Sequence, residues 1–178
     1  MLDFEWEDED VIEDEFPQKP SKPNVIVKDN GTVIHGYRGP KGELFPHRED
    51  GPAYISSRVR EWYFNGLQHN SDAPAKVFSL ETPGIEEVWY LNGQRHREDG
   101  PAIIRQTGEV RWMFNGVLHR KDGPAVIEIE KQEWWQYGKR HREDGPAVIR
   151  GEFQEYWVRG IRISRESRLD SMGRPPGV

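Results

Sequence analysis

A seven-residue segment, HREDGPA, recurs along this chain and constrains its fold more than any other feature. Identical copies begin at His47, His96 and His141. The copy at His119 reads HRKDGPA, and a more divergent copy at His69 reads HNSDAPA. The five histidines are separated by 22, 27, 23 and 22 residues. Such a short period, sustained over most of the chain, indicates a repeat array in which each unit completes the core of its neighbours.

A second block, rich in aromatic residues and closed by glycine, precedes each heptad after the first. Its copies are WYFNG at Trp62–Gly66, WYLNG at Trp89–Gly93, WMFNG at Trp112–Gly116 and WWQYG at Trp134–Gly138. A more divergent copy, YWVRG, lies at Tyr156–Gly160. In the first four copies the glycine lies three residues before the heptad histidine, and Ile163 takes the histidine's place after the fifth. The two blocks therefore form one repeating unit.

One unit can be interpreted residue by residue from Gly100 to Asp122. Ala102–Arg105 and Val110–Phe114 are β-rich runs, and the cluster at Gln106–Glu109 separates them as a turn. Asn115-Gly116 follows, the residue pair that best tolerates the positive φ angles of a tight hairpin turn. Two strands and two turns in about 22 residues leave no room for a helix. The unit therefore predicts an antiparallel meander.

The composition favours a thin, elongated fold over a spherical one. Hydrophobic residues make up only 34% of the chain, yet it contains seven Trp, six Tyr and seven Phe, whose large side chains can stabilise a sheet without a deep interior. We predict an all-β fold, a single-layer, curved antiparallel β-hairpin repeat array. Its expected parts are an acidic arm and Pro/Lys linker at 1–23, a capping hairpin at 24–44, five repeats at 45–163 and an irregular tail at 164–178.

Strand alternation predicts which side chains share a face of the sheet. The first strand of each unit places an alanine beside the residue two positions later, in the pairs Ala53/Ile55, Ala75/Val77, Ala102/Ile104, Ala125/Ile127 and Ala147/Ile149. In the second strand Trp62, Trp89 and Trp112 share a face with Phe64, Leu91 and Phe114. We expect these residues to form a continuous buried stripe. A second row is expected to be exposed on the other side: Tyr63, Tyr90, Met113, Trp135 and Trp157.

The combined pattern W-Y-x-N-G-x-x-H-R-x-D-G-P-A covers roughly Phe45 to Ile163. It resembles the divergent MORN-like repeats of bacteriophage and giant-virus proteins. The resemblance implies a hairpin-array fold and, from MORN proteins in general, scaffolding or surface docking. It implies no catalytic residue. It also implies a phage origin, which makes a host protein one candidate partner.

The charge of the chain is concentrated at its N-terminus. Residues 1–16 hold nine acidic residues and no basic one, whereas the remainder has 25 basic residues against 22 acidic ones. Aromatic residues interleave with these acids, as in amphipathic segments that fold on a partner. The alternatives are a solubilising tail, a segment that folds back on the body, and a mimic of a nucleic-acid backbone. The arm residues expected to bind a partner are Phe4, Trp6, Asp8, Asp10 and Phe16.

Localisation follows from three further features. An acidic N-terminus is unlike the basic start of a signal peptide, and no apolar run approaches the ~18 residues of a membrane-spanning helix. The chain has no cysteine, which excludes disulfides and thiolate zinc sites and is compatible with a reducing compartment. We therefore expect a cytoplasmic protein, in the host cytoplasm if a phage encodes it.

The repeated histidines and aspartates resemble metal-binding or catalytic residues, but we interpret their role as structural. A transition metal needs several ligands within ~2.0–2.3 Å of one point, whereas successive heptads are about 10 Å apart. A catalytic histidine needs one singular environment, and the chain has no phosphate-binding loop, G-x-S-x-G or H-E-x-x-H motif. No catalytic residue, metal or cofactor is predicted. The expected structural role is to brace the heptad turn, with the aspartates accepting hydrogen bonds from the residues that follow: Asp50, Asp72, Asp99, Asp122 and Asp144.

We therefore predict a non-enzymatic protein-binding scaffold that uses the acidic arm and the second aromatic row. The alternative is a module for small anionic ligands or nucleic acid, in which repeated arginines line up beside exposed aromatic rings. Those arginines are Arg48, Arg97, Arg120 and Arg142. Glu49, Glu98 and Glu143 adjoin three of them and would largely cancel their field.

Overall fold

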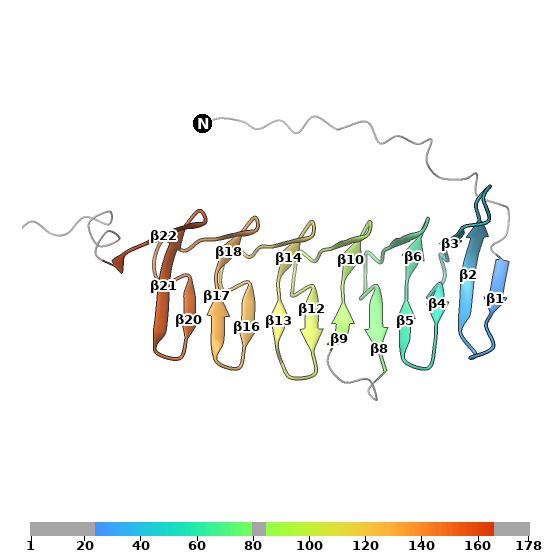
Figure 1. Ribbon diagram of the computed structural model, residues 1–178, viewed down its shortest axis with the longest axis horizontal. Helices are drawn as coiled ribbons and strands as arrows, with labels where there is room; N and C mark the ends of the chain where they lie inside the picture. Colours follow the sequence, from blue (N-terminus) through green and yellow to red (C-terminus); the bar gives the residue numbers. More distant parts are fainter. Residues whose placement is uncertain (1–23, 80–84, 166–178) are drawn as a thin grey trace, which may run out of the picture.

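The computed structural model describes residues 24–79 and 85–165, which form 22 β-strands and the turns between them. The elements of the described residues are all strands, and their pairings are antiparallel, so the predicted all-β hairpin array is confirmed. The strands stand side by side in one open row that does not close into a barrel (Figure 1). Residues 1–23, 80–84 and 166–178 lie outside the described residues, and with them the predicted acidic arm and linker and most of the predicted tail.

A fourteen-stranded sheet runs along the whole array, in the order β1-β2-β4-β5-β8-β9-β12-β13-β16-β17-β20-β21-β22, with β3 also paired to β2. Its N-terminal part consists of β1 (Asn24–Val27), β2 (Val33–Arg38) and β3 (Leu44–Pro46). Two strands then follow each heptad: β4 (Tyr54–Ile55) and β5 (Val59–Glu61); β8 (Lys76–Phe78) and β9 (Ile85–Val88); β12 (Ile103–Arg105) and β13 (Val110–Arg111); β16 (Val126–Glu128) and β17 (Lys131–Glu133); β20 (Val148–Arg150) and β21 (Phe153–Val158).

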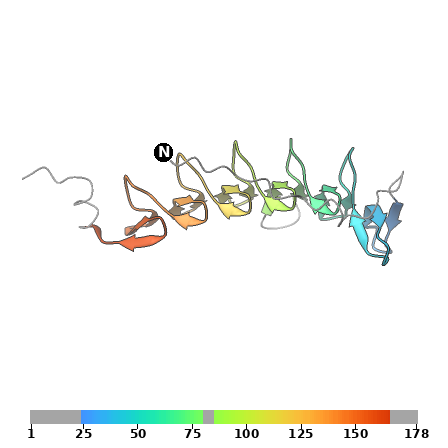
Figure 2. The same cartoon turned by 90° about the horizontal axis from the view of Figure 1, so that it is seen from above.

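A short hairpin follows each of these five strand pairs, and it begins the unit whose heptad comes after it. Four of these hairpins are separate two-stranded sheets: β6 (Tyr63–Phe64) with β7 (Leu67–Gln68), β10 (Tyr90–Leu91) with β11 (Gln94–Arg95), β14 (Met113–Phe114) with β15 (Val117–Leu118), and β18 (Trp135–Gln136) with β19 (Lys139–Arg140). The fifth pairs the end of β21 with β22 (Ile161–Ile163). Seen from above, the strands follow a shallow arc, and a narrow loop projects from one side of the arc at each repeat (Figure 2).

The hairpin turns have the backbone that their Asn-Gly sequences predict. The first turn residue has a φ of 44–51° at Asn65, Asn92, Asn115, Tyr137 and Arg159, and the glycine after it has a φ of 74–83°. Two successive positive φ angles define the type I′ turn, whose twist matches that of paired strands. The last two hairpins keep this turn although tyrosine and arginine replace asparagine.

In the direction across the strands, each tryptophan position lies next to alanine positions of the neighbouring strands. Ala53, Ala75, Ala102, Ala125 and Ala147 are fully buried. The Trp112 backbone N–H donates to the Ala125 carbonyl, and the Ala102 N–H donates to the carbonyl of Arg111, so Trp112 lies between two alanines. The alanines are buried as predicted, whereas the tryptophans of this row are only half-buried.

The row that was expected to be exposed instead lies on the better-buried side. Met113 is only 9% exposed and clusters with Val88, Ala102 and Ile103, against which Tyr90 also packs. Tyr63, Tyr90, Trp135 and Trp157 are half-buried. The prediction of an exposed row is therefore wrong for Met113 and overstated for the other four.

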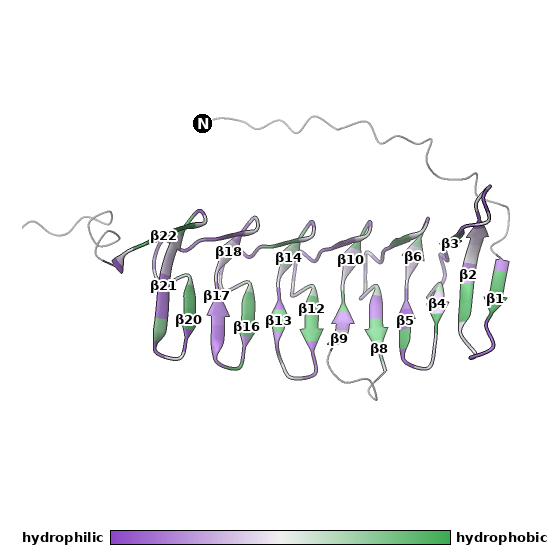
Figure 3. Ribbon diagram, viewed as in Figure 1, coloured by the Kyte–Doolittle hydropathy of each residue, from purple (hydrophilic) through white to green (hydrophobic). Residues whose placement is uncertain are grey.

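The hairpins account for this difference. The hairpin residues Met113, Tyr90 and Leu118 pack in one cluster with the sheet residues Val88 and Ile103, so the hairpins cover this part of the sheet. In Figure 3 the strands β12, β16 and β20 are coloured hydrophobic, whereas β17 and much of the upper edge are hydrophilic. The opposite, outer side of the bend carries the tryptophans and the heptads.

Candidate functional site

The five heptad histidines join neighbouring units. The Nδ1 atom of each accepts a hydrogen bond from the first turn residue of the next hairpin, at 3.0 Å from Asn65 to His47 and 3.2 Å in the other four pairs. Those four pairs are Asn92 with His69, Asn115 with His96, Tyr137 with His119, and Arg159 with His141. The histidine was expected to brace its own heptad turn, whereas in the structure it contacts the hairpin of the next unit. In His47, His119 and His141 the accepting Nδ1 leaves the proton on Nε2. In His69 and His96 the Nδ1 atom also lies 2.8 and 2.7 Å from the Oδ1 atom of the same asparagine, so either ring nitrogen can carry the proton there.

Aromatic rings pack against these imidazoles along the hairpin row. The ring centroids of His96 and Phe114 are 4.7 Å apart, and those of His47 and Phe64 are 5.0 Å apart. His119 stacks on Tyr137 at 4.2 Å. Burial lowers the pKa of His119 below its usual value. A neutral imidazole that accepts a hydrogen bond and stacks on a ring serves as a structural link.

The repeated arginines are also engaged. The guanidinium carbons of Arg97, Arg120 and Arg142 lie 3.9, 3.8 and 4.0 Å from the ring centroids of Trp89, Trp112 and Trp134. Each arginine thus covers the indole of its own unit, in a geometry that favours cation–π attraction. Stacking of this kind withdraws the guanidinium from solvent and from an incoming ligand.

Three of the heptad aspartates fix the arginine side chains. The Nε atoms of Arg48, Arg97 and Arg142 donate to carboxylates two residues later, at 2.7, 2.9 and 2.8 Å, which belong to Asp50, Asp99 and Asp144. These hydrogen bonds lower the pKa of Asp50 and of Asp99. The acceptor role was expected, but the donor differs, because it is the preceding arginine instead of the turn that follows. The other two heptad aspartates, Asp72 and Asp122, are exposed.

The heptad glycine makes room for the arginine. A Cβ added to Gly100 or Gly145 would lie 2.7 Å from the guanidinium carbon of Arg97 or Arg142. In the second unit both positions differ, since Asn70 replaces the arginine and Ala73 replaces the glycine. The paired change fits the geometry, because without the guanidinium a methyl group at this position meets no such obstacle.

Three open grooves recur on the outer side, one between each pair of successive heptad loops from the second unit to the fifth. Their volumes are about 540, 550 and 690 Å³. Each is lined by the loop of one unit together with the tryptophan, histidine and loop of the next. The residue two positions after the tryptophan completes the lining, and it is Leu91, Phe114 and Gln136 in turn.

The exposed charge around these grooves comes mainly from carboxylates. The side chains of Glu98 and Asp99 are 80% and 83% exposed, whereas that of the neighbouring Arg97 is only 21% exposed. Glu143 and Arg142 repeat the contrast, at 74% and 22%. Along the predicted arginine row, the groups that face the solvent are therefore carboxylates, which argues against binding of nucleic acid.

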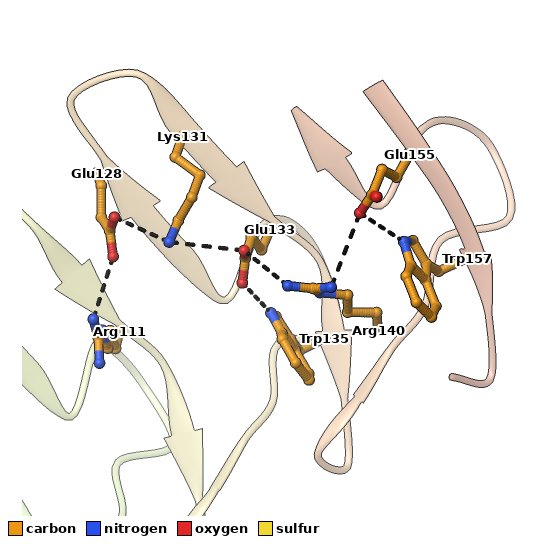
Figure 4. A network of polar contacts seen from close by, with 8 residues as sticks. All are labelled: Arg111, Glu128, Lys131, Glu133, Trp135, Arg140, Glu155 and Trp157. Atoms are coloured by element: carbon orange, nitrogen blue, oxygen red, sulfur yellow. Dashed lines mark hydrogen bonds and ion pairs between the residues drawn. The ribbon is translucent and has the colours of Figure 1, made fainter. Parts of the chain in front are cut away.

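On the inner side of the bend, the charges pair with one another (Figure 4). Buried Glu133 accepts hydrogen bonds from Arg140 at 3.3 Å and from the Trp135 indole at 2.9 Å. The Arg140 guanidinium lies between Trp135 and Trp157, 5.1 and 5.3 Å from their ring centroids. The Trp157 indole donates in turn to Glu155 at 3.1 Å.

The network continues toward the third unit. Lys131 bridges Glu133 and Glu128 at 3.7 and 3.0 Å, and Arg111 donates to Glu128 at 3.2 Å. The hydrogen bonds and positive charges of Lys131 and Arg111 lower the pKa of Glu128 despite its partial burial. This inner face is a stabilising network that the sequence pattern did not reveal. Trp135 and Trp157, which were expected to bind a partner, have their indole N–H groups satisfied within it.

The remaining predicted site residues, Phe4, Trp6, Asp8, Asp10 and Phe16, lie outside the described residues. Within residues 24–79 and 85–165, no three histidine or acidic side chains come together in a way that could hold a metal ion. Nor do the described residues include a helix of the length and apolarity needed to cross a membrane. Scans against protein-family models, curated proteins and solved structures find no match to this chain.

Proposed function

We propose that this chain is a non-enzymatic protein-binding scaffold whose outer side is the binding surface. The observation that carries the proposal is the use of the recurring residues. Histidine, arginine, aspartate and glycine of the heptads contact one another or the next unit, while the spaces between the loops stay open as equivalent grooves. A series of similar shallow grooves suits an extended partner surface better than one small substrate.

The acidic arm is the second proposed determinant, because it occurs once and lies next to the array in sequence. The resemblance to phage and giant-virus MORN-like repeats supports a phage-encoded protein with a host protein as its partner. The absence of cysteine agrees with a cytoplasmic site of action. An anionic ligand or nucleic acid is less well supported, because Arg97, Arg120 and Arg142 are stacked on tryptophans.

The proposal is tested by affinity capture with the full chain and two charge-reversal variants. One variant changes the loop residues Glu49, Glu98 and Glu143 to lysine. The matched control changes Glu130 and Glu152, which are exposed at turns of the sheet outside the grooves, to lysine. A specific partner should be recovered by the wild type and the control but lost from the loop variant. Recovery by all three proteins in equal amounts would contradict binding through the outer side.

Deletion of residues 1–16 tests the arm separately. If the arm contributes to binding, its removal should weaken capture of the same partner while the melting temperature of the array stays unchanged. Undiminished capture would remove the arm from the proposal and leave the outer side as the binding determinant.

A further inference from the structure

The outer grooves differ in charge, although they share one geometry. The groove between the second and third units has three carboxylates, from Asp72, Glu98 and Asp99, against the single guanidinium of Arg97. The groove between the third and fourth units is lined by three carboxylates and three basic groups, so its charges balance. The carboxylates belong to Glu98, Asp99 and Asp122, and the basic groups to Arg97, Arg120 and Lys121. The acidic excess therefore lies in the N-terminal half of the outer side.

The heptad loops, compared one by one, show that the fourth unit differs in charge from the other four. In the first, third and fifth units the loop has one arginine against a glutamate and an aspartate, so its carboxylates outnumber its basic groups by one, and the fourth unit interrupts this acidic series. The second unit has Asp72 and no base in its loop. In the fourth unit Lys121 stands where the first, third and fifth have glutamate, and it reverses the sign of the loop.

The floor of each groove is suited to the stem of a long side chain. Trp89 and Leu91 line the groove between the second and third units, with His96 beside them. Carboxylates at the rim and apolar groups below match an arginine or a lysine, whose methylene stem packs on apolar surface while its charge stays near the acids.

The spacing of the grooves restricts the conformation of the partner. Each unit contributes two strands to the sheet, and neighbouring strands are about 4.8 Å apart, so equivalent loops recur about every 9.6 Å. A polyproline II helix has three residues per turn and a rise of about 3.1 Å, so every third side chain points the same way about every 9.3 Å. A β-strand does not match, because residues three apart point to opposite sides.

We propose that the outer side of the first three units binds a basic polyproline II segment of a partner protein, with a cation at every third residue. Lys121 ends this surface by repelling the next cation. The inference rests on the proposed scaffold function and specifies its partner. The partner is a cationic, proline-rich segment, so neither nucleic acid nor an acidic peptide should bind to this surface.

The test uses two labelled peptides with the same number of arginines. One repeats Arg-Pro-Pro four times, and the other repeats Arg-Pro-Pro-Pro four times, so only the spacing of the cations differs. Fluorescence anisotropy at physiological salt should show several-fold tighter binding of the three-residue repeat to the full chain. Equal affinities would mean unspecific charge attraction and would overturn the proposal, as would failure of both peptides to bind.

Charge variants give a second test, because one of them is expected to bind the peptide more tightly than the wild type. Lys121→Glu makes two further grooves acidic and should tighten binding of the three-residue repeat roughly tenfold, an effect that misfolding cannot produce. Asp72→Asn should weaken binding several-fold, and Glu130→Gln, outside the grooves, should leave it unchanged. No gain from Lys121→Glu would overturn the proposal. If the peptides fail but a captured partner is still lost from the loop variant, the scaffold function stands and only this assignment of the partner falls.

Discussion

Replacing Gly100 with alanine should reveal how the heptad glycine depends on its arginine. The added methyl group would lie 2.7 Å from the guanidinium carbon of Arg97, whereas ordinary contacts begin at 3.4 Å. The guanidinium must therefore move by at least about 0.7 Å. It now lies 3.9 Å from the ring centroid of Trp89, so this movement disturbs the stacked pair.

The size of the effect follows from two opposing contributions. Loss of a partly desolvated cation–π pair costs about 1–2 kcal/mol. Replacing glycine by alanine also restricts the unfolded chain, which stabilises the fold by about 0.4–1 kcal/mol where the backbone is compatible. Gly100 is not in the left-handed region, so this gain applies. The net result should be a loss of about 0.5–1 kcal/mol in the wild-type chain.

The sign should reverse when the arginine is absent. In an Arg97→Asn background, which reproduces the residues of the second unit, Gly100→Ala should stabilise the protein by about 0.4–1 kcal/mol. Denaturant unfolding of the wild type, both single variants and the double variant forms a double-mutant cycle. The same sign and size of effect in both backgrounds would refute the claim that glycine is needed to accommodate the guanidinium.

Three further outcomes are expected. Burial holds the pKa of folded His119 below the unfolded value near 6.5, so its contribution is complete above that value and is lost as pH falls; the melting temperature should drop between pH 7.5 and pH 5, and His119→Ala should reduce that drop. Arg159→Asn should raise stability by about 0.5–1 kcal/mol in thermal unfolding, because Arg159 has a φ of 51°, which asparagine tolerates better; no rise would contradict backbone strain at this turn. Met113→Ala should lower the free energy of unfolding, measured with denaturant, by about 2–3 kcal/mol because Met113 is buried. An effect near zero would mean that Met113 is exposed, as the sequence pattern had predicted.

Periodicity and turn chemistry made most of the fold predictable. The spacing of the heptads and the Asn-Gly pairs predicted antiparallel strands and hairpin turns, and the positive φ angles at Asn65, Asn92 and Asn115 confirm the turns. These features are local, because a type I′ turn depends on the two residues that form it. Local rules of this kind can be applied to a sequence without knowing the tertiary structure.

The identity of the exposed row could not be predicted in the same way. Alternation correctly separates Trp112 from Met113, but it does not say which of the two sides will be covered. That depends on the direction in which the hairpin projects from the sheet, which is a tertiary property. The pairing of Asn70 with Ala73 was a usable signal, since joint loss of arginine and glycine in one unit suggests that the two side chains meet. The link from histidine to the following unit had no such sequence signal.

The protonation of the ring nitrogens tests most directly the central claim that the recurring residues join one unit to the next. Long-range ¹H–¹⁵N spectra at pH 7.5 report which imidazole nitrogen carries the proton. His47, His119 and His141 accept backbone N–H bonds at Nδ1, so each should be fixed as the Nε2–H tautomer. Averaged signals from freely exchanging tautomers, or protons on Nδ1, would show that these histidines do not hold neighbouring units together.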